Sequence, residues 1–185
     1  GATSIGYQYH HQESNTQIYA LERKVKIAEK AKTLIAPDSV VMISGGTTNL
    51  ELVRHLPKNL TGTFFTPSLP VALELMTHPL LEVIFIGGRL SKNAQIPVCG
   101  KALEQIRDIR VDLCFLGTGY LDVQNGLTEF DWDVVQIKKA MLQSADKVIS
   151  LTISEKLNTT QRYKISNIQA IHTLITELDS LDEQL

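Results

Sequence analysis

The feature that most limits how this chain can fold is a repeated alternation of short apolar runs with amphipathic segments. The apolar runs, rich in β-branched residues, predict strands at residues 40–44, 61–66, 81–87, 111–117, 148–152 and 172–176. The amphipathic segments predict helices at residues 17–36 and near 48–56, 69–77, 99–108 and 132–145. Continuously apolar strands separated by helices are typical of a parallel sheet that is covered on both faces. The sequence therefore predicts a doubly wound α/β fold with a mainly parallel sheet.

Length and composition exclude several classes of protein. A chain of 185 residues can bury a substantial core and best fits a single folded domain. The net charge of −2 offers no electrostatic basis for nucleic-acid binding by this chain alone. No apolar run approaches the roughly 18 residues of a membrane span. A signal-peptide pattern is also missing, so we expect a cytoplasmic protein without a membrane partner.

The cysteines and histidines indicate neither a metal site nor a cofactor. Cys99 and Cys114 match no zinc or redox spacing, and Cys114 lies in the apolar run VDLCFLG, which predicts a buried thiol. His10 and His11 lie in residues 1–16, a polar lead-in without periodicity, where adjacent histidines are usually solvated. We expect residues 1–16 to be a linker or a truncated start.

The end of the first predicted strand is the leading candidate for a binding site, because doubly wound sheets bind ligands beyond the carboxyl ends of their strands. Ser44, Gly45, Gly46, Thr47 and Thr48 follow this strand, and a helix begins directly after them. Glycines let N–H groups approach a ligand, and a helix N-terminus adds free donors and partial positive charge. The pattern predicts a phosphate-binding loop; a capped turn without a ligand remains the alternative. It is not a Walker A loop, because no Gly-Lys-Ser/Thr follows.

Two other segments carry positive charge near strand ends. Gly87, Gly88 and Arg89 follow the third predicted strand, where the guanidinium can lie beside an anion or at the surface. Lys138 and Lys139 lie on the predicted helix of residues 132–145. One of these lysines can turn back towards the loops, although paired lysines on a helix usually form a solvated face.

The fourth predicted strand ends in another glycine-bearing segment. Gly117 and Gly119 flank a threonine, and Gly126 follows seven residues after Gly119. The pattern resembles a dinucleotide fingerprint only superficially, because Asp122 stands where a third glycine is needed. The acids nearest to strand ends form no acid/base pair by spacing; they are Asp112, Asp131 and Asp133.

Several segments together resemble a known family. They are ALERKVKIAEKAKTLI in the first helix, SGGTT at 44–48, TPSLPVA at 66–72, IGGRL at 86–90, VDLCFLGTGY at 111–120, GLTEFDWDVVQIKKAM at 126–141 and SEKL at 154–157. In this order they are similar to the C-terminal effector-sensing domain of DeoR-type transcriptional regulators. The resemblance spans nearly the whole chain from about residue 17.

The resemblance implies a fold like that of ribose-phosphate isomerases and CoA transferases, without enzyme activity. It implies a sugar-phosphate effector at the strand ends, a homo-oligomer and a repressor of sugar metabolism genes. DNA binding would belong to an N-terminal helix-turn-helix domain, which this chain does not show. Residues 17–185 would then be the sensor domain, and residues 1–16 the linker before it.

The resemblance also implies a set of binding residues. Those expected to hold the phosphate are Ser44, Gly45, Gly46, Thr47, Thr48, Gly87, Gly88, Arg89, Lys138 and Lys156. Those expected to contact the rest of the effector are Ser68, Gly117, Gly119 and Gly126.

Four positions depart from the family pattern. Ser44 stands where the family usually has Asp, Pro67 replaces Asn, Val134 replaces Glu and Ile153 replaces Asp. These changes leave two alternatives: an effector with the same phosphate and a different sugar, or a domain that has lost sensing and mainly oligomerises. An isomerase-like enzyme is a third alternative. We expect no catalysis, because a site without those acids lacks the carboxylate base that isomerisation requires.

Overall fold

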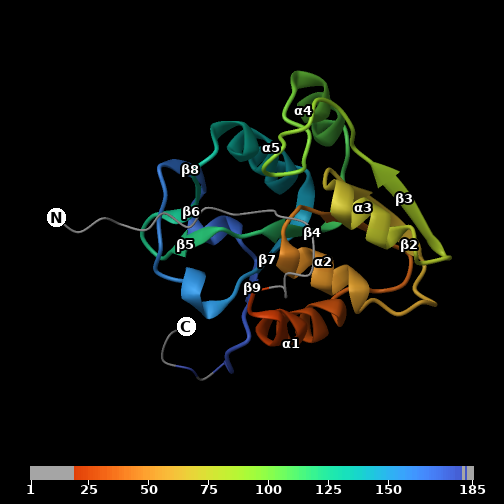
Figure 1. The fold of residues 1–185 in the computed structure, drawn as a ribbon, viewed down its shortest axis with the longest axis horizontal. Coiled ribbons are helices and arrows are strands. Elements are labelled where there is room, and N and C mark those ends of the chain that lie inside the picture. Colours follow the sequence, from red (N-terminus) through yellow and green to blue (C-terminus); the bar gives the residue numbers. More distant parts are fainter. Residues whose placement is uncertain (1–18, 181, 183–185) are drawn as a thin grey trace.

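The computed structural model describes residues 19–180 and 182, and its centre is a six-stranded parallel sheet (Figure 1). Across the sheet the strands are β3 (Leu81–Phe85), β2 (Gly62–Thr66), β1 (Ser39–Ile43), β4 (Val111–Gly117), β7 (Ala145–Leu151) and β9 (Thr173–Ile175). Every neighbouring pair is parallel. The predicted doubly wound sheet is therefore confirmed, and each predicted strand is one of its members.

Helices cover both faces of this sheet (Figure 1). One layer contains α1 (Leu21–Lys32), α2 (Thr47–Arg54) and α3 (Leu69–Leu75), and the other contains α4 (Gly100–Arg107) and α5 (Trp132–Gln143). Short 3-10 turns are η1 (Ser154–Lys156) and η2 (Ile168–Ala170). No helix in the described part of the chain is long and apolar enough to cross a membrane.

The first helix is shorter than the 17–36 segment predicted from the sequence. Ala20 has a left-handed backbone with φ 54°, so the helix begins only at Leu21. At the other end the Thr33 hydroxyl donates to the Lys30 carbonyl at 2.7 Å, which competes with continued helix. Residues 1–18 lie outside the described part, so the predicted linker of residues 1–16 stays a prediction.

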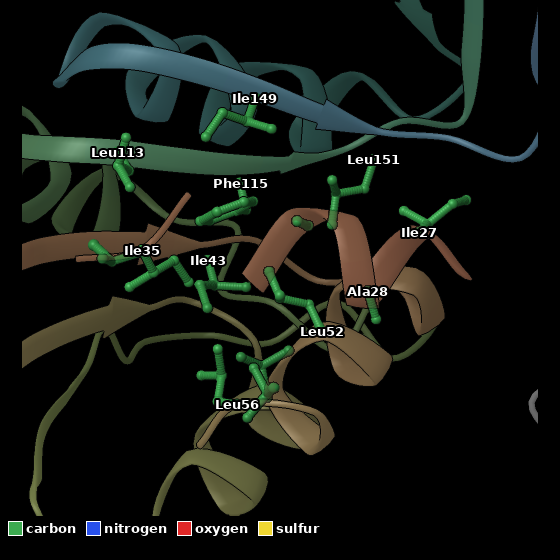
Figure 2. Close-up of a cluster of buried hydrophobic side chains, with 14 of the residues drawn as sticks. Ile27, Ala28, Ile35, Ile43, Leu52, Leu56, Leu113, Phe115, Ile149 and Leu151 are labelled. Carbon is green, nitrogen blue, oxygen red and sulfur yellow. The ribbon is translucent and has the colours of Figure 1, made fainter. Parts of the chain in front are cut away.

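Strand residues point alternately into two core layers, as the period of a β-strand requires. Figure 2 shows the first layer, in which Ile43, Phe115 and Leu151 of three neighbouring strands pack with Ile27 of α1 and Leu52 of α2. All five side chains are essentially inaccessible to solvent. This layer fixes α1 and α2 against the same face of the sheet.

The second layer lies on the opposite face. Met42 of β1 and Cys114 and Leu116 of β4 pack with Ile106 of α4 and Ile137 of α5. Since these strand residues alternate with those of the first layer, β1 and β4 are buried on both faces. Their carboxyl ends are consequently held at one fixed position in the molecule.

A small antiparallel sheet beyond β4 was missed by the sequence analysis. Its strands, in order, are β5 (Tyr120–Asp122), β6 (Gly126–Glu129) and β8 (Tyr163–Ser166). Strands of three or four residues are too short to show an alternating pattern. This sheet carries residues 120 and 129 towards the carboxyl ends of the main strands, where the candidate site lies.

The two cysteines are free and differ in reactivity. Hydrogen bonds from the backbone of Ala102 and Arg89 lower the pKa of the half-buried Cys99 thiol, whereas burial raises the pKa of Cys114 to about 12. Because the thiolate is the reactive form, we expect Cys99 alone to react with a thiol reagent in the native protein at neutral pH. Thiol titration should show Cys114 reacting only after denaturation. Native reaction persisting in Cys99→Ser would contradict this assignment.

Candidate functional site

The candidate site lies where the two central strands send the chain in opposite directions. After β1 the chain continues to β2 on one side, and after β4 it continues to β7 on the other. The loops therefore diverge and leave a crevice at the carboxyl ends of the strands. A cavity of about 170 Å³ occupies this position and is lined by the loops after β1 and β4, by β6, α5 and η1.

The loop after β1 presents backbone donors to this cavity. Gly45, Gly46, Thr47 and Thr48 all line it, and Gly46, with φ 115°, is the residue that caps α2. A residue with a side chain rarely adopts that backbone conformation. No side chain caps the helix. The first N–H groups of α2, which have no acceptor within the helix, are therefore available to bind an anion.

The Ser44 side chain links the ends of the two central strands, β1 and β4. Its hydroxyl oxygen accepts a hydrogen bond of 2.6 Å from the Gly117 N–H, and this joins the end of β1 to the end of β4. The Ser44 side chain is buried at the wall of the cavity. A phosphate contact by this hydroxyl, as expected from the sequence, would have to replace the bond of 3.2 Å that it donates to the Gly45 carbonyl.

Asn49 reinforces the same junction and was missed by the sequence analysis. Its amide nitrogen donates to the carbonyl oxygens of Ser44 at 3.0 Å and Phe115 at 3.2 Å. The side chain is buried beside the cavity, and its amide oxygen has no hydrogen-bond partner among residues 19–180. The sequence feature that could have revealed this role is a polar residue in the first turn of a helix that follows two glycines.

Gly117 is required by the close approach of the two strands. A Cβ at this position would lie 2.3 Å from the Gly45 carbonyl oxygen and 2.9 Å from the Ser44 hydroxyl. Gly117 and Gly119 both line the cavity, and their contact with the effector stays a prediction.

Two lysines reach the cavity from different elements. Lys138 of α5 donates to Glu129 at 2.6 Å, with only 11% of the lysine side chain and 8% of the glutamate side chain exposed. Lys156 of η1 donates to the Thr118 carbonyl at 3.3 Å. Both lysines line the cavity, so the structure brings them together with the loop after β1.

The expectation that the site lacks acidic side chains is wrong. Glu129 and Asp131 both line the cavity. Asp131 caps α5 by accepting from the N–H groups of Asp133 at 3.0 Å and Val134 at 3.4 Å. Glu129 faces Lys138 from the end of β6, a strand that the sequence pattern did not reveal. The cavity therefore contains carboxylates, so the lack of a carboxylate base does not exclude catalysis.

The glycine-arginine segment after β3 does not reach the cavity wall. The Arg89 guanidinium donates to the Val98 carbonyl at 2.9 Å, and Gly88 packs against Cys99. Later residues of the same loop line the cavity in place of Gly87, Gly88 and Arg89; these are Asn93, Ala94 and Ile96.

Ser68 and Gly126 also lie away from the cavity wall. Ser68 is buried behind Gly45, with its hydroxyl 3.5 Å from where a Cβ of Gly45 would be. Gly126, with φ 75°, allows β6 to approach β8, because a Cβ there would lie 2.1 Å from the Ser166 carbonyl oxygen. Both residues therefore have structural roles next to the site.

The four departures from the family pattern do not share one environment. Ser44, Pro67 and Val134 line the cavity. Ile153 instead belongs to the hydrophobic core on the α1 and α2 face and is 2% exposed. The cavity wall is mixed, since apolar side chains of α5 lie beside its charged groups.

A family model described as the DeoR C terminal sensor domain matches residues 20–178. The chain therefore belongs to the DeoR family of sensor domains, which confirms the resemblance read from the sequence. Among the residues that the structure describes, no group of histidine, cysteine and acidic side chains is arranged to hold a metal ion.

Curated relatives of the chain are transcriptional regulators. It is 32% identical over 175 residues to the HTH-type transcriptional regulator GlpR of Haloferax volcanii, covering 95% of this chain and 68% of that protein. It is 27% identical over 157 residues to the glycerol-3-phosphate regulon repressor of Escherichia coli, covering 84% of this chain and 62% of that protein. The chain thus spans roughly two thirds of such regulators.

Solved structures show the same fold in proteins of other functions. The delta subunit of eIF2B from Chaetomium thermophilum aligns with a TM-score of 0.61 at 16% identity, over 86% of this chain and 57% of that one. Ribose 5-phosphate isomerase A from Methanocaldococcus jannaschii aligns with a TM-score of 0.52 at 18% identity, over 72% and 53%. The expected isomerase-like fold is confirmed.

The close approach of Gly117 to Gly45 predicts that one added methyl group at residue 117 lowers the stability of the protein. Gly117→Ala places a carbon against the Gly45 carbonyl, so we expect a loss of about 1–3 kcal/mol in the free energy of unfolding. Gly100→Ala is the control, because no atom lies within 4 Å of its Cβ position. Urea denaturation should show unchanged or slightly raised stability for that control. Equal stabilities of the two variants would contradict the close approach.

Proposed function

We propose that this domain senses a small phosphorylated sugar in the cavity between the ends of β1 and β4. The observation that carries this proposal is the convergence of the α2 N-terminus with Lys156, and with Lys138 in its pair with Glu129, on one cavity. Backbone N–H groups and lysines are the groups that bind phosphate in proteins. A relative is named as a glycerol-3-phosphate regulon repressor, which supports a phosphorylated effector.

The phosphate would lie against the N–H groups of residues 45–48. Thr47 and Thr48 add hydroxyl groups on the same side of the cavity, and Lys156 adds positive charge from η1. The remaining wall would contact the sugar. This part of the wall contains polar residues, such as Tyr120 and Asn93, and apolar residues, such as Ile137. It can therefore contact a compound that has both hydroxyl groups and C–H surface.

The occupied cavity would act on transcription through the N-terminal side of the domain. Helix α1 packs directly on α2, the helix whose first turn would hold the phosphate. Lys24 of α1 is buried, and burial, followed by the charge of Lys156, lowers the pKa of Lys24 to about 8. A cavity residue thus influences α1 electrostatically. An effector can shift DNA binding only if it favours one of two states of the regulator.

In the full protein, a DNA-binding helix-turn-helix domain would precede α1, and the whole would repress genes of sugar metabolism. Support comes from the relatives, which include regulators named as HTH-type. We propose no catalysis, because these relatives are named as regulators and Glu129 is held by Lys138.

A ligand screen with a matched pair of variants tests this function. We expect sugar phosphates, and not the corresponding free sugars, to raise the melting temperature; a ligand at 100 times its dissociation constant adds about 2.7 kcal/mol. Lys156→Met should weaken binding about tenfold or more, since a hydrogen bond to a charged group contributes about 1.5–3 kcal/mol. The exposed Lys147→Met is the control. A phosphate-dependent shift that is equal in both variants would exclude Lys156 from the site.

A second function, self-association, is supported by an apolar surface at the edge of the sheet. Leu73 of α3 and Met76, which caps that helix, are 61% and 71% exposed; Leu80 in the following loop and Phe85 of β3 are also exposed. Strand β3 has an unpaired edge among the described residues. An exposed apolar patch beside a free strand edge is typical of a protein interface.

Self-association through this surface predicts a change in molecular mass. Leu73→Glu with Met76→Glu should convert an oligomer into a monomer, as measured by analytical ultracentrifugation, because two buried charges would destabilise the interface. Val123→Glu is the control, since Val123 is equally exposed in the turn between β5 and β6. An oligomer that tolerates the double substitution would place the interface elsewhere.

A further inference from the structure

Glu129 occupies a position from which it can act on any ligand in the cavity. It is the last residue of β6, and pairing with β5 and β8 on both sides holds that strand in place. Its carboxylate reaches the end of β4, because a Cβ on Gly119 would lie 3.7 Å from Oε2. The side chain is buried and lines the cavity.

The hydrogen bonds of Glu129 leave acceptor capacity that faces no other described donor. Oε1 accepts from the Phe130 N–H at 3.0 Å, and Oε2 accepts from Lys138 at 2.6 Å. A carboxylate offers about four acceptor positions, so roughly half of its capacity remains. A ligand hydroxyl can donate to these positions, whereas a phosphate or carboxylate has no proton to donate and repels the charge.

The cavity therefore has two unlike ends. The N–H groups of residues 45–48, at the positive N-terminus of α2, form a donor end. Glu129 forms an acceptor end, and it also neutralises Lys138, which would otherwise attract a second anion. A ligand that matches both ends carries one phosphate at one terminus and a hydroxyl group at the other.

We propose that Glu129 determines the specificity of the cavity by accepting a ligand hydroxyl and rejecting a second anionic group. The inference rests on the proposed function, since it presumes a phosphate at the donor end. The ligand class is then a sugar monophosphate with a free hydroxyl at its far end. Sugar bisphosphates and phosphorylated sugar acids are excluded.

Val134 provides an independent way to test this role. It lies one helical turn before Lys138, and both residues line the cavity, so a side chain at 134 faces the same lysine. A carboxylate moved from 129 to 134 would stay beside Lys138 and within the cavity.

The experiment measures binding of matched ligand pairs by calorimetry. The probes are hexose 6-phosphates with their 1,6-bisphosphates, pentose 5-phosphates with their 1,5-bisphosphates, and inorganic phosphate. Wild type should bind one monophosphate at least tenfold more tightly than its bisphosphate. Glu129→Gln should bring this ratio close to one or invert it. Val134→Glu in the Glu129→Gln background should restore the preference, and the exposed Glu104→Gln should leave it unchanged.

The possible results distinguish a failure of the proposed function from a failure of the role proposed for Glu129. If no phosphorylated compound binds wild type, the proposed function fails and the inference fails with it. If monophosphates bind and the ratio stays the same in Glu129→Gln, only the role of Glu129 is overturned. A wild type that binds a bisphosphate as tightly as its monophosphate overturns that role as well, and this result requires no variant that might fold poorly.

Discussion

The hydrogen bond from the Gly117 N–H to the Ser44 hydroxyl holds the two central strands together where their loops diverge. The cavity depends on this contact, because its floor is formed by the ends of these two strands. Asn49 strengthens the junction by donating to carbonyl groups of both strands. Two core layers, one on each face, prevent the strand ends from shifting. The resulting site is largely preformed, which reduces the ordering cost of binding a small ligand.

Lys138 and Glu129 form a buried ion pair in the wall of the cavity. Burial of Lys138 and Glu129 together limits the desolvation cost that either would incur alone. Asp131 also accepts two hydrogen bonds, both at Oδ1 and both from the first turn of α5, but it is less buried than Glu129. Lys156 also lines the cavity, donates to the Thr118 carbonyl and influences Lys24 of the first helix. The same side chains can therefore recognise an anion and connect the cavity to α1.

The sequence predicted the main sheet well, since its strands are mainly apolar and four helical patterns lie between them. The loop of residues 44–48 lines the cavity, because the carboxyl ends of parallel strands meet at one edge, and its phosphate-binding role stays a prediction. The role of Glu129 was not predictable, as strands as short as β6 lack a detectable period. Arg89 was misplaced because a sequence shows a charge near a strand end and not the Val98 carbonyl that binds it.

The most direct measurement is a titration of the isotope-labelled domain with a sugar phosphate, followed by the backbone amide resonances. The account predicts saturable shifts that are largest at the N–H groups of Gly45, Gly46, Thr47 and Thr48, where the helix N-terminus would hold the phosphate. The corresponding unphosphorylated sugar should leave these resonances unchanged. Saturable shifts confined to residues away from the β1–β4 junction would contradict the central claim.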